Sequence, residues 1–269
     1  MSVFTLTPGG TPLLISMPHT ATGVPPELAA RMTAAGRLLP DTDWHIDRLY
    51  GFASELRAGV IRPEMSRYVI DLNRAPDGRA LYADAKNTEL CPTSTFAEQP
   101  IWQPGEEPDE AEIARRRERY WRPYHDALST ELRRLKDRHG LVLLWDAHSI
   151  RSHVPRFFEG RLPDLNFGTA GGVSTSPELI GRLMEIAGNA APYSAVLDGR
   201  FKGGFITRAY GRPGEGVHAV QLELAQIAYM EEDPPYAYRA DLAETLQPVL
   251  RRLLAAMMGW ARAQPDFRP

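Results

Sequence analysis

The sequence predicts a single α/β domain in which a mixed, mostly parallel central sheet is flanked by helices. Three observations predict this class: two short, almost wholly apolar runs, helical patterns that separate them, and weaker strand patterns between the helices. The sequence contains no internal repeat and no low-complexity linker, and 269 residues are compatible with one large domain. We therefore expect residues 1–269 to form one domain.

The two apolar runs, Pro12–Met17 and Leu141–Trp145, predict strands that are buried on both faces. Each run leads directly to a histidine, since His19 follows the first and His148 follows the second. Because ligands in open α/β sheets gather at the carboxyl ends of the strands, we expect both histidines near one rim of the sheet. The weaker strand patterns are Val60–Ile61, Tyr68–Leu72, Ala195–Leu197 and Val217–Leu224.

Three segments have the apolar spacing and the end signals of helices. The first is Ile113–Leu135, with Asp109 as its N-cap and Pro123 as a kink or break. The second, Ser176–Gly188, opens with a Ser-Pro pair and ends at a glycine. The third is Leu242–Trp260. Helices that alternate with strands in this way can cover both faces of a sheet.

The composition excludes several classes of protein. With 43% hydrophobic and 24% charged residues and no stretch of about 18 uninterrupted apolar residues, the sequence predicts a water-soluble globular protein without a membrane partner. A net charge of −3 gives no broad positive field, so we expect no nucleic-acid partner. The single Cys91 cannot form an internal disulfide and the N-terminus lacks a secretory signal pattern, so we expect a cytoplasmic protein.

His19 and His148 are the first candidates for chemistry. A divalent metal is the simplest reason for two imidazoles at one rim, and catalytic zinc usually adds a carboxylate and keeps one position open to water. The run Asp41–Asp47 supplies three aspartates and a further histidine. Each aspartate can instead cap the helix that this run opens, and each histidine can be an ordinary core or surface residue. The residues alone leave the ligand set open.

Cationic residues suggest where an anionic ligand binds. Arg74 and its neighbour Asn73 suit a carboxylate, because a guanidinium meets a carboxylate through two parallel hydrogen bonds, and Arg67 can polarise a scissile carbonyl. Lys202 lies beside glycines that permit close approach to a ligand. A solvated strand and a surface turn are the alternatives. The irregular stretch 75–107, with four prolines, is typical of a segment that crosses a site.

Glu223 is an acidic residue within the otherwise apolar strand pattern Val217–Leu224. In a strand, Gln221 and Glu223 share one face. An acid is costly to bury unless it is paired or functional, and a general base beside an activated water is one such function. The alternative is a glutamate on an edge strand that faces water.

Six short motifs carry a resemblance to the N-formylglutamate amidohydrolase family over roughly residues 12 to 260. They are Ser16–His19 (SMPH), Thr42–His45 (TDWH), Ser66–Arg74 (SRYVIDLNR), Asp146–Ser149 (DAHS), Phe201–Arg208 (FKGGFITR) and Gln221–Leu224 (QLEL). Each motif is weak alone, but six in the right order are specific. That family is similar to the zinc carboxypeptidases and aspartoacylases, so the resemblance implies a phosphorylase/hydrolase-like fold.

The resemblance also implies a metal centre. It implies one zinc or other divalent ion per chain, bound by His19 and His148. Asp43 resembles the carboxylate ligand, with Asp47 as the alternative. Glu223 resembles the base that activates water.

The implied substrate site is cationic. Asn73 and Arg74 match the pair that grips a substrate carboxylate in aspartoacylases, and Arg67 resembles their oxyanion-stabilising arginine. The substrate carries two carboxylates, so we expect Lys202 or Arg208 to bind the second.

These roles predict metal-dependent hydrolysis of N-formyl-L-glutamate to formate and L-glutamate, the last step of a histidine degradation pathway. One alternative is the same chemistry on another N-acyl amino acid or on a peptide end. The other is a non-catalytic protein that binds dicarboxylic amino acids through the arginines and needs no metal. Glu223 beside the candidate ligands favours an enzyme. The sequence predicts no particular oligomeric state.

Overall fold

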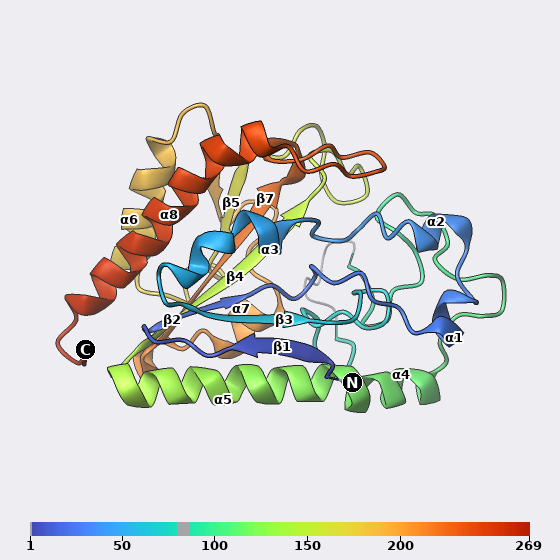
Figure 1. Cartoon of the computed structure of the whole chain (residues 1–269), viewed down its shortest axis with the longest axis horizontal. Helices are drawn as coiled ribbons and strands as arrows, with labels where there is room; N and C mark the ends of the chain where they lie inside the picture. Colours follow the sequence, from blue (N-terminus) through green and yellow to red (C-terminus); the bar gives the residue numbers. More distant parts are fainter. Residues whose placement is uncertain (1, 80–86) are drawn as a thin grey trace.

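A seven-stranded sheet forms the centre of the protein (Figure 1). The computed structural model describes residues 2–79 and 87–269, and its strands lie in the order β1-β3-β2-β4-β7-β5-β6. Their bounds are β1 (Phe4–Thr7), β2 (Leu13–Ser16), β3 (Gly59–Pro63), β4 (Val142–Ile150), β5 (Leu165–Gly168), β6 (Ala195–Leu197) and β7 (Val217–Ala225). Only β1 with β3 and β5 with β7 pair antiparallel among these strands. The mixed, mostly parallel sheet is therefore confirmed.

Helices cover both faces of the sheet. In Figure 1, α5 runs along the bottom of the view, and α6 and α8 lie on the other side of the strands. The helices are α1 (Pro26–Ala29), α2 (Ala34–Arg37), α3 (Ile46–Leu49), α4 (Glu110–Arg116), α5 (Arg122–His139), α6 (Pro177–Gly188), α7 (Phe205–Tyr210) and α8 (Ala240–Arg262). Short 3₁₀ segments span Gly51–Ser54, Pro213–Glu215 and Gln226–Ala228.

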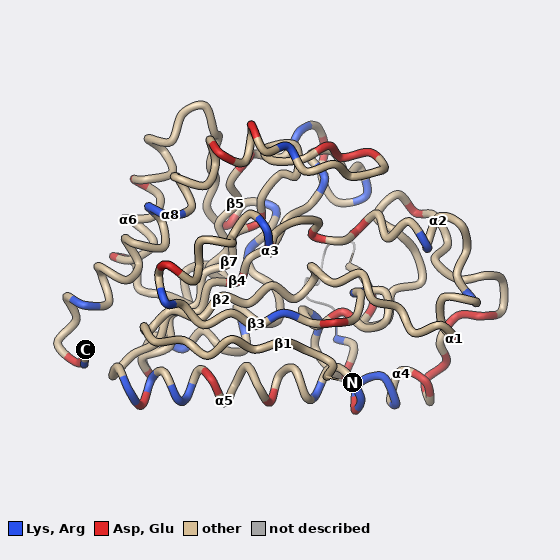
Figure 2. The backbone as a smooth tube through the Cα atoms, viewed as in Figure 1, with Lys and Arg blue, Asp and Glu red and all other residues tan. Residues whose placement is uncertain are grey.

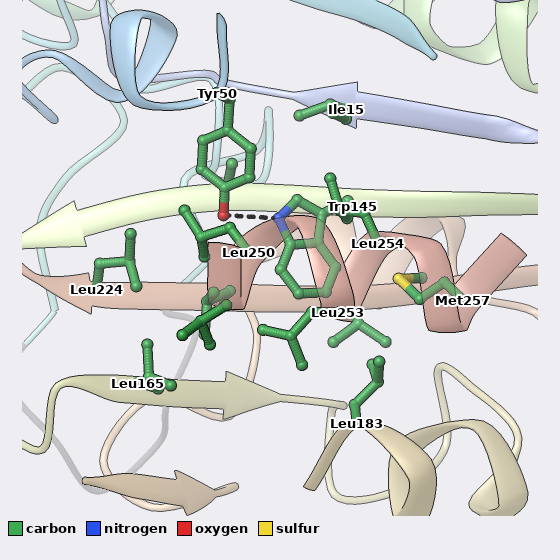
Figure 3. Close-up of a cluster of buried hydrophobic side chains, with 14 of the residues drawn as sticks. Ile15, Tyr50, Trp145, Leu165, Leu183, Leu224, Leu250, Leu253, Leu254 and Met257 are labelled. Carbon is green, nitrogen blue, oxygen red and sulfur yellow. Dashed lines mark hydrogen bonds between the residues drawn. The ribbon is translucent and has the colours of Figure 1, made fainter. Parts of the chain in front are cut away.

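Burial on both faces explains the apolar sequences of β2 and β4. Leu13 and Ile15 of β2 pack in a core with residues of α3, α6 and α8, whereas Leu14 packs in a second core with α5. In the first core, Trp145 Nε1 of β4 donates a hydrogen bond of 2.9 Å to Tyr50 Oη, among leucines of α8 (Figure 3). Full burial of an aliphatic side chain of this size contributes roughly 1.5–3 kcal/mol.

The three predicted helices are confirmed, with their end signals in place. The Asp109 side chain accepts a 2.7 Å hydrogen bond from Glu112 N at the start of α4. A π-helical turn, Arg117–Trp121, joins α4 to α5 without a break, and Pro123 is the second residue of α5. Ser176 caps α6, and α8 continues through Pro248 without interruption.

Two strand predictions differ from the structure. Strand β4 runs beyond its apolar part to Ile150, so His148 lies inside the strand, because β7 pairs with β4 along its whole length. The predicted strand Tyr68–Leu72 is wrong, because this segment forms turns. Its apolar side chains are buried in the second core although the segment is not part of the sheet, and Val69 N donates to Ser66 O at 2.9 Å, as in a turn. Strands β1 and β5 were outside the predicted set.

Charged residues are frequent along α4 and α5. Figure 2 shows basic and acidic residues interspersed along α4 and α5, whereas the apolar positions of α5 face the sheet. Within residues 2–79 and 87–269, no helix combines the length and the apolarity needed to cross a membrane.

Candidate active site

Most of the residues that the sequence singles out meet in one cavity. This cavity lies at the carboxyl ends of the parallel strands, where open α/β folds bind their ligands. Its lining includes His19, Arg67, Asn73, Arg74, His148 and Glu223. Residues 87, 88 and 96 also line it, so the described part of the long irregular stretch does pass over the site.

The side chains of His19, Asp43 and His148 form a compact, buried group. One candidate ligand atom from each residue lies within 4.8 Å of the others. Asp43 Oδ2 is 3.0 Å from His148 Nδ1 and 3.6 Å from His19 Nδ1. Two atoms that each lie ~2.0–2.1 Å from a tetrahedral ion are roughly 3.3 Å apart. The spacing of this group therefore suits a divalent metal.

An aspartate lies behind each of the two histidines. His19 Nε2 is 2.7 Å from Asp71 Oδ1, and His148 Nε2 is 3.2 Å from Asp146 Oδ1. Carboxylates in these positions help to orient the imidazole rings, and Nδ1 of each ring faces Asp43. Burial alone lowers the pKa of His148, but the carboxylates of Asp146 and Asp43 outweigh burial and raise it well above its ordinary value.

Asp43 reaches the histidines from the loop between α2 and α3. Its backbone N donates to His19 O at 3.0 Å, and Gln226 Nε2 fixes the same loop by donating to Thr42 O at 2.9 Å. Burial alone raises the pKa of Asp43, but hydrogen bonds from His148 and His19 hold it well below its ordinary value. Among the described residues, nothing donates a hydrogen bond to buried Asp43 Oδ1. An ionised, buried carboxylate with an unpartnered oxygen fits a metal ligand.

The other two aspartates of this run lie elsewhere. Asp47 is exposed and pairs with Arg62 at 2.8 Å, away from the histidines. Asp41 Oδ2 accepts hydrogen bonds from Tyr68 Oη at 2.6 Å and Phe96 N at 2.9 Å. Burial raises the pKa of Asp41 to about 6. Of the three aspartates, only Asp43 joins the histidines.

Glu223 is held at the centre of the sheet. Its strand, β7, lies between β4 and β5, and it sits in register opposite His148, so the alternative of an edge-strand glutamate is wrong. Gln221 Nε2 donates to Glu223 Oε2 at 3.1 Å, and Gln221 Oε1 accepts from Gly204 N at 2.7 Å. The shared face predicted for these two side chains is thus observed. Burial raises the pKa of Glu223 to about 7.

Arg67 is buried and tied to the ligand group. Its Nη2 donates to Asp71 Oδ2 at 2.7 Å, and its Nη1 lies 4.0 Å from Asp43 Oδ1. Asp71 therefore bridges Arg67 to His19. This bridge keeps the guanidinium at the wall of the cavity without exposing its charge to solvent.

Asn73 and Arg74 follow in the same irregular segment. Asn73 Nδ2 is 2.9 Å from His148 Nε2, and Asn73 Oδ1 accepts from Ile206 N at 2.8 Å. Arg74 Nε and Nη2 donate to Thr88 Oγ1 at 3.1 and 2.6 Å. Contacts to three different segments thus position this pair in the cavity wall.

The segment before α7 differs from its prediction. Lys202 and Arg208 are exposed, and neither lines the cavity, whereas Arg200 does. The glycines beside Lys202 serve close packing, because a Cβ at Gly204 would lie 2.2 Å from Asn73 Nδ2. Gly204 therefore permits the close approach of Asn73, a residue of this chain, rather than that of a ligand.

Sequence reasoning gave no role to three residues of this site: Asp71, Asp146 and Arg200. Asp146 could have been found, because residues two apart in a strand share a face, which places Asp146 beside His148. Asp71 lies in a turn, where no periodicity indicates direction.

Comparisons with known proteins agree on one family. The model of the N-formylglutamate amidohydrolase family matches residues 11–230. An N-formylglutamate deformylase of Pseudomonas aeruginosa is 52% identical over 94% of this chain and 95% of its own length. One from Pseudomonas putida is 51% identical over 94% of both.

Solved structures show the same architecture. The crystal structure of N-formylglutamate amidohydrolase from Ralstonia eutropha JMP134 superposes with a TM-score of 0.82 at 25% identity, over 97% of this chain and 99% of that one. A gene product of Agrobacterium tumefaciens shares the fold, with a TM-score of 0.67 at 17% identity over 96% of both chains.

Proposed function

The chain belongs to the N-formylglutamate amidohydrolase family, and from this premise we propose that it hydrolyses N-formyl-L-glutamate to formate and L-glutamate. The observation that carries the proposal is the buried group of His19, Asp43 and His148 beside Glu223 in one cavity. We propose further that residues 1–269 act as one catalytic domain. The single sheet, with a core on each face, supports this.

We assign the metal to Nδ1 of His19, Nδ1 of His148 and the carboxylate of Asp43. Zinc or another divalent ion at these ligands supplies Lewis acidity, which lowers the pKa of a water molecule and polarises the formyl carbonyl. The unpartnered Asp43 Oδ1 and the aspartates behind both histidines support the assignment.

Glu223 is the general base in this proposal. Its carboxylate takes a proton from the water whose oxygen attacks the formyl carbon, and it later gives that proton to the amine nitrogen as the C–N bond breaks. The hydrogen bond that Gln221 Nε2 donates to Glu223 Oε2 fixes the orientation of the whole carboxylate group. It therefore also sets the direction in which Oε1 points. A pKa near 7 allows the carboxyl group to accept and to return a proton at neutral pH.

Arg67 stabilises the oxyanion that develops on the formyl oxygen. Its ion pair with Asp71 holds the guanidinium before the substrate arrives, so little reorganisation is needed during the reaction. Asn73 and Arg74 hold a substrate carboxylate, as suits an amide and a guanidinium in the same wall.

Formate release from N-formyl-L-glutamate tests the proposal. We expect the purified, zinc-loaded protein to release formate from this substrate faster than from N-formylaspartate, and to act poorly on N-acetylglutamate or a short peptide. No formate between about pH 6 and 9 with the metal bound would reject the proposed substrate. Preference for the acetylated compound or the peptide would support the alternative deacylase or peptidase.

Metal analysis separates the enzyme from a non-catalytic binding protein. We expect about one equivalent of zinc per chain, lost in a His19→Ala, His148→Ala double variant. An unchanged metal content in that variant would overturn the ligand assignment. Zinc-free protein that still binds glutamate derivatives with full affinity would support the binding-protein alternative.

A further inference from the structure

Three arginines line the cavity, and they differ in how they are held. Arg67 is fully buried and ion-paired with Asp71 at 2.7 Å. Arg74 is half-buried and donates to Thr88. Arg200 is also half-buried, and it belongs to the segment between β6 and α7. The ion pair makes Arg67 part of the ligand group, whereas Arg74 and Arg200 bring further cationic groups into the lining.

Arg200 is held by a backbone carbonyl and by aromatic rings. Its Nε donates to Phe157 O at 2.6 Å, and its guanidinium lies over the rings of Phe157 and Phe201, 5.5 and 5.4 Å from their centroids. Both rings line the cavity. Aromatic faces attract a guanidinium and keep water from it, and a charge-assisted hydrogen bond is stronger in such a setting.

The two arginines differ in their relation to the metal ligands. Arg74 follows Asn73, whose Nδ2 is 2.9 Å from His148 Nε2, so Arg74 enters the cavity from the backbone next to the ligand group. Arg200 enters from the aromatic wall. In a formylated amino acid, the α-carboxylate is two bonds from the amide nitrogen, and the side-chain carboxylate of glutamate is four bonds from it. The arginine beside the ligand group therefore suits the α-carboxylate.

We propose that Arg200 binds the side-chain carboxylate of the substrate and thereby selects formylated dicarboxylic amino acids, while Arg74 binds the α-carboxylate. This assignment rests on the proposed function. It gives the second carboxylate to Arg200, in place of the exposed Lys202 and Arg208 that the sequence suggested.

Paired substrates test the assignment. N-formyl-L-glutamine has the shape of N-formyl-L-glutamate but no side-chain charge, so the ratio of the two kcat/KM values reports recognition of that charge. We expect zinc-loaded wild type to prefer the glutamate compound by on the order of 100-fold. Arg200→Met should lower kcat/KM for the glutamate compound by a similar factor and change the glutamine compound by less than about threefold.

Matched variants complete the experiment. Arg200→Gln, which keeps hydrogen-bond donors but not the charge, should lose the preference in the same way if Arg200→Met folds poorly. Arg74→Met should lower kcat/KM for both substrates by similar factors, because both carry an α-carboxylate. Arg182→Met is the control, since Arg182 is an exposed residue of α6 paired with Glu178, and it should retain wild-type values.

The outcomes separate the inference from the proposed function. Equal losses of kcat/KM on both substrates in the Arg200 variants would overturn the assignment, since Arg200 would then only stabilise the fold. Loss of the preference in Arg74→Met with retention in Arg200→Met would reverse it. A zinc-loaded wild type that releases no formate from either substrate would overturn the proposed function itself.

Discussion

The cavity has two sides that are built in different ways. The strand side comprises His19, His148 and Glu223, which lie at or near the ends of β2, β4 and β7. The loop side comprises residues 67–74 and 87–96, which form turns and irregular structure. On the strand side, backbone pairing sets the positions of His148 and Glu223, which are register partners, and His19 follows β2. On the loop side, individual side-chain hydrogen bonds set them.

This difference in construction suggests that the two sides of the cavity have different functions. Sheet register fixes atoms closely, as the proposed metal ligand His148 and the proposed general base Glu223 require. The loop side carries Arg67 and Arg74, and it can vary without disturbing the sheet. The two sides meet at Asp71, which belongs to the loop side yet contacts His19. Changes on the strand side should therefore affect the chemical step most, and changes at Asn73 and Arg74 of the loop side should affect substrate binding.

The largest expected effect is on the strand side. Glu223→Gln should lower kcat by on the order of 10³-fold with little change in KM, because the amide keeps the shape but cannot take a proton. Zinc content should remain that of wild type. Steady-state kinetics check this, with Asp47→Asn as the control, since exposed Asp47 pairs with Arg62 outside the cavity. A Glu223→Gln enzyme within tenfold of wild type would show that the base lies elsewhere.

A second prediction concerns the support of the loop side. His125 of α5 holds this side, because its Nε2 is 2.9 Å from Leu72 O and its Nδ1 is 2.9 Å from Tyr210 Oη. Burial lowers the pKa of His125 to about 4, against an ordinary value of about 6.5. The unfolded chain therefore binds the proton more readily. The stability that neutral His125 contributes is complete above about pH 6.5 and is lost as the pH falls towards 4.

Denaturant unfolding at several pH values checks this support. The free energy of unfolding of wild type should fall relative to that of His125→Gln by up to about 3 kcal/mol between pH 7 and pH 4. His218, whose pKa burial also lowers to about 4, is present in both proteins and cancels in the difference. Parallel pH curves for the two proteins would show that His125 does not titrate as a buried neutral ring.

A third prediction compares the aspartates behind the two histidines. Asp146 supports His148 on the strand side, and Asp71 supports His19 from the loop side. Replacement of either by Asn should weaken zinc binding by roughly 10–100-fold in a chelator competition. Only Asp71→Asn should also lower kcat of the zinc-saturated enzyme, because Asp71 holds the oxyanion-stabilising Arg67 as well. An unchanged kcat in zinc-saturated Asp71→Asn would remove the link between the two sides.

The sequence predicted the strand side better than the loop side, for a physical reason. Apolar runs and period-two alternation report burial in a sheet, so they placed His19 and His148 at one rim and marked Glu223 as an acid within an apolar strand. Tyr68–Leu72 has the composition of a strand, yet tertiary contacts fold it into turns. In a turn, the spacing of residues along the sequence does not indicate which way each side chain points.

The aspartates and cations show the same limit. Among three aspartates in one run, only the folded loop places Asp43 against His148. Among the cations near residue 200, the fold turns Arg200 into the cavity and Lys202 to solvent. Such choices depend on long-range packing, which a local pattern does not contain.

The smallest expected effect tests how rigid the strand side is. Tyr50→Phe removes the hydrogen bond to Trp145 Nε1 and should lower the free energy of unfolding by about 1 kcal/mol. Trp145 lies three residues before His148 on β4, so a loosened strand would displace the His148 side chain. Pairing with both β2 and β7 holds β4, however, and kcat should stay within about twofold of wild type. A larger fall in kcat would mean that side-chain packing, as on the loop side, also positions the strand side.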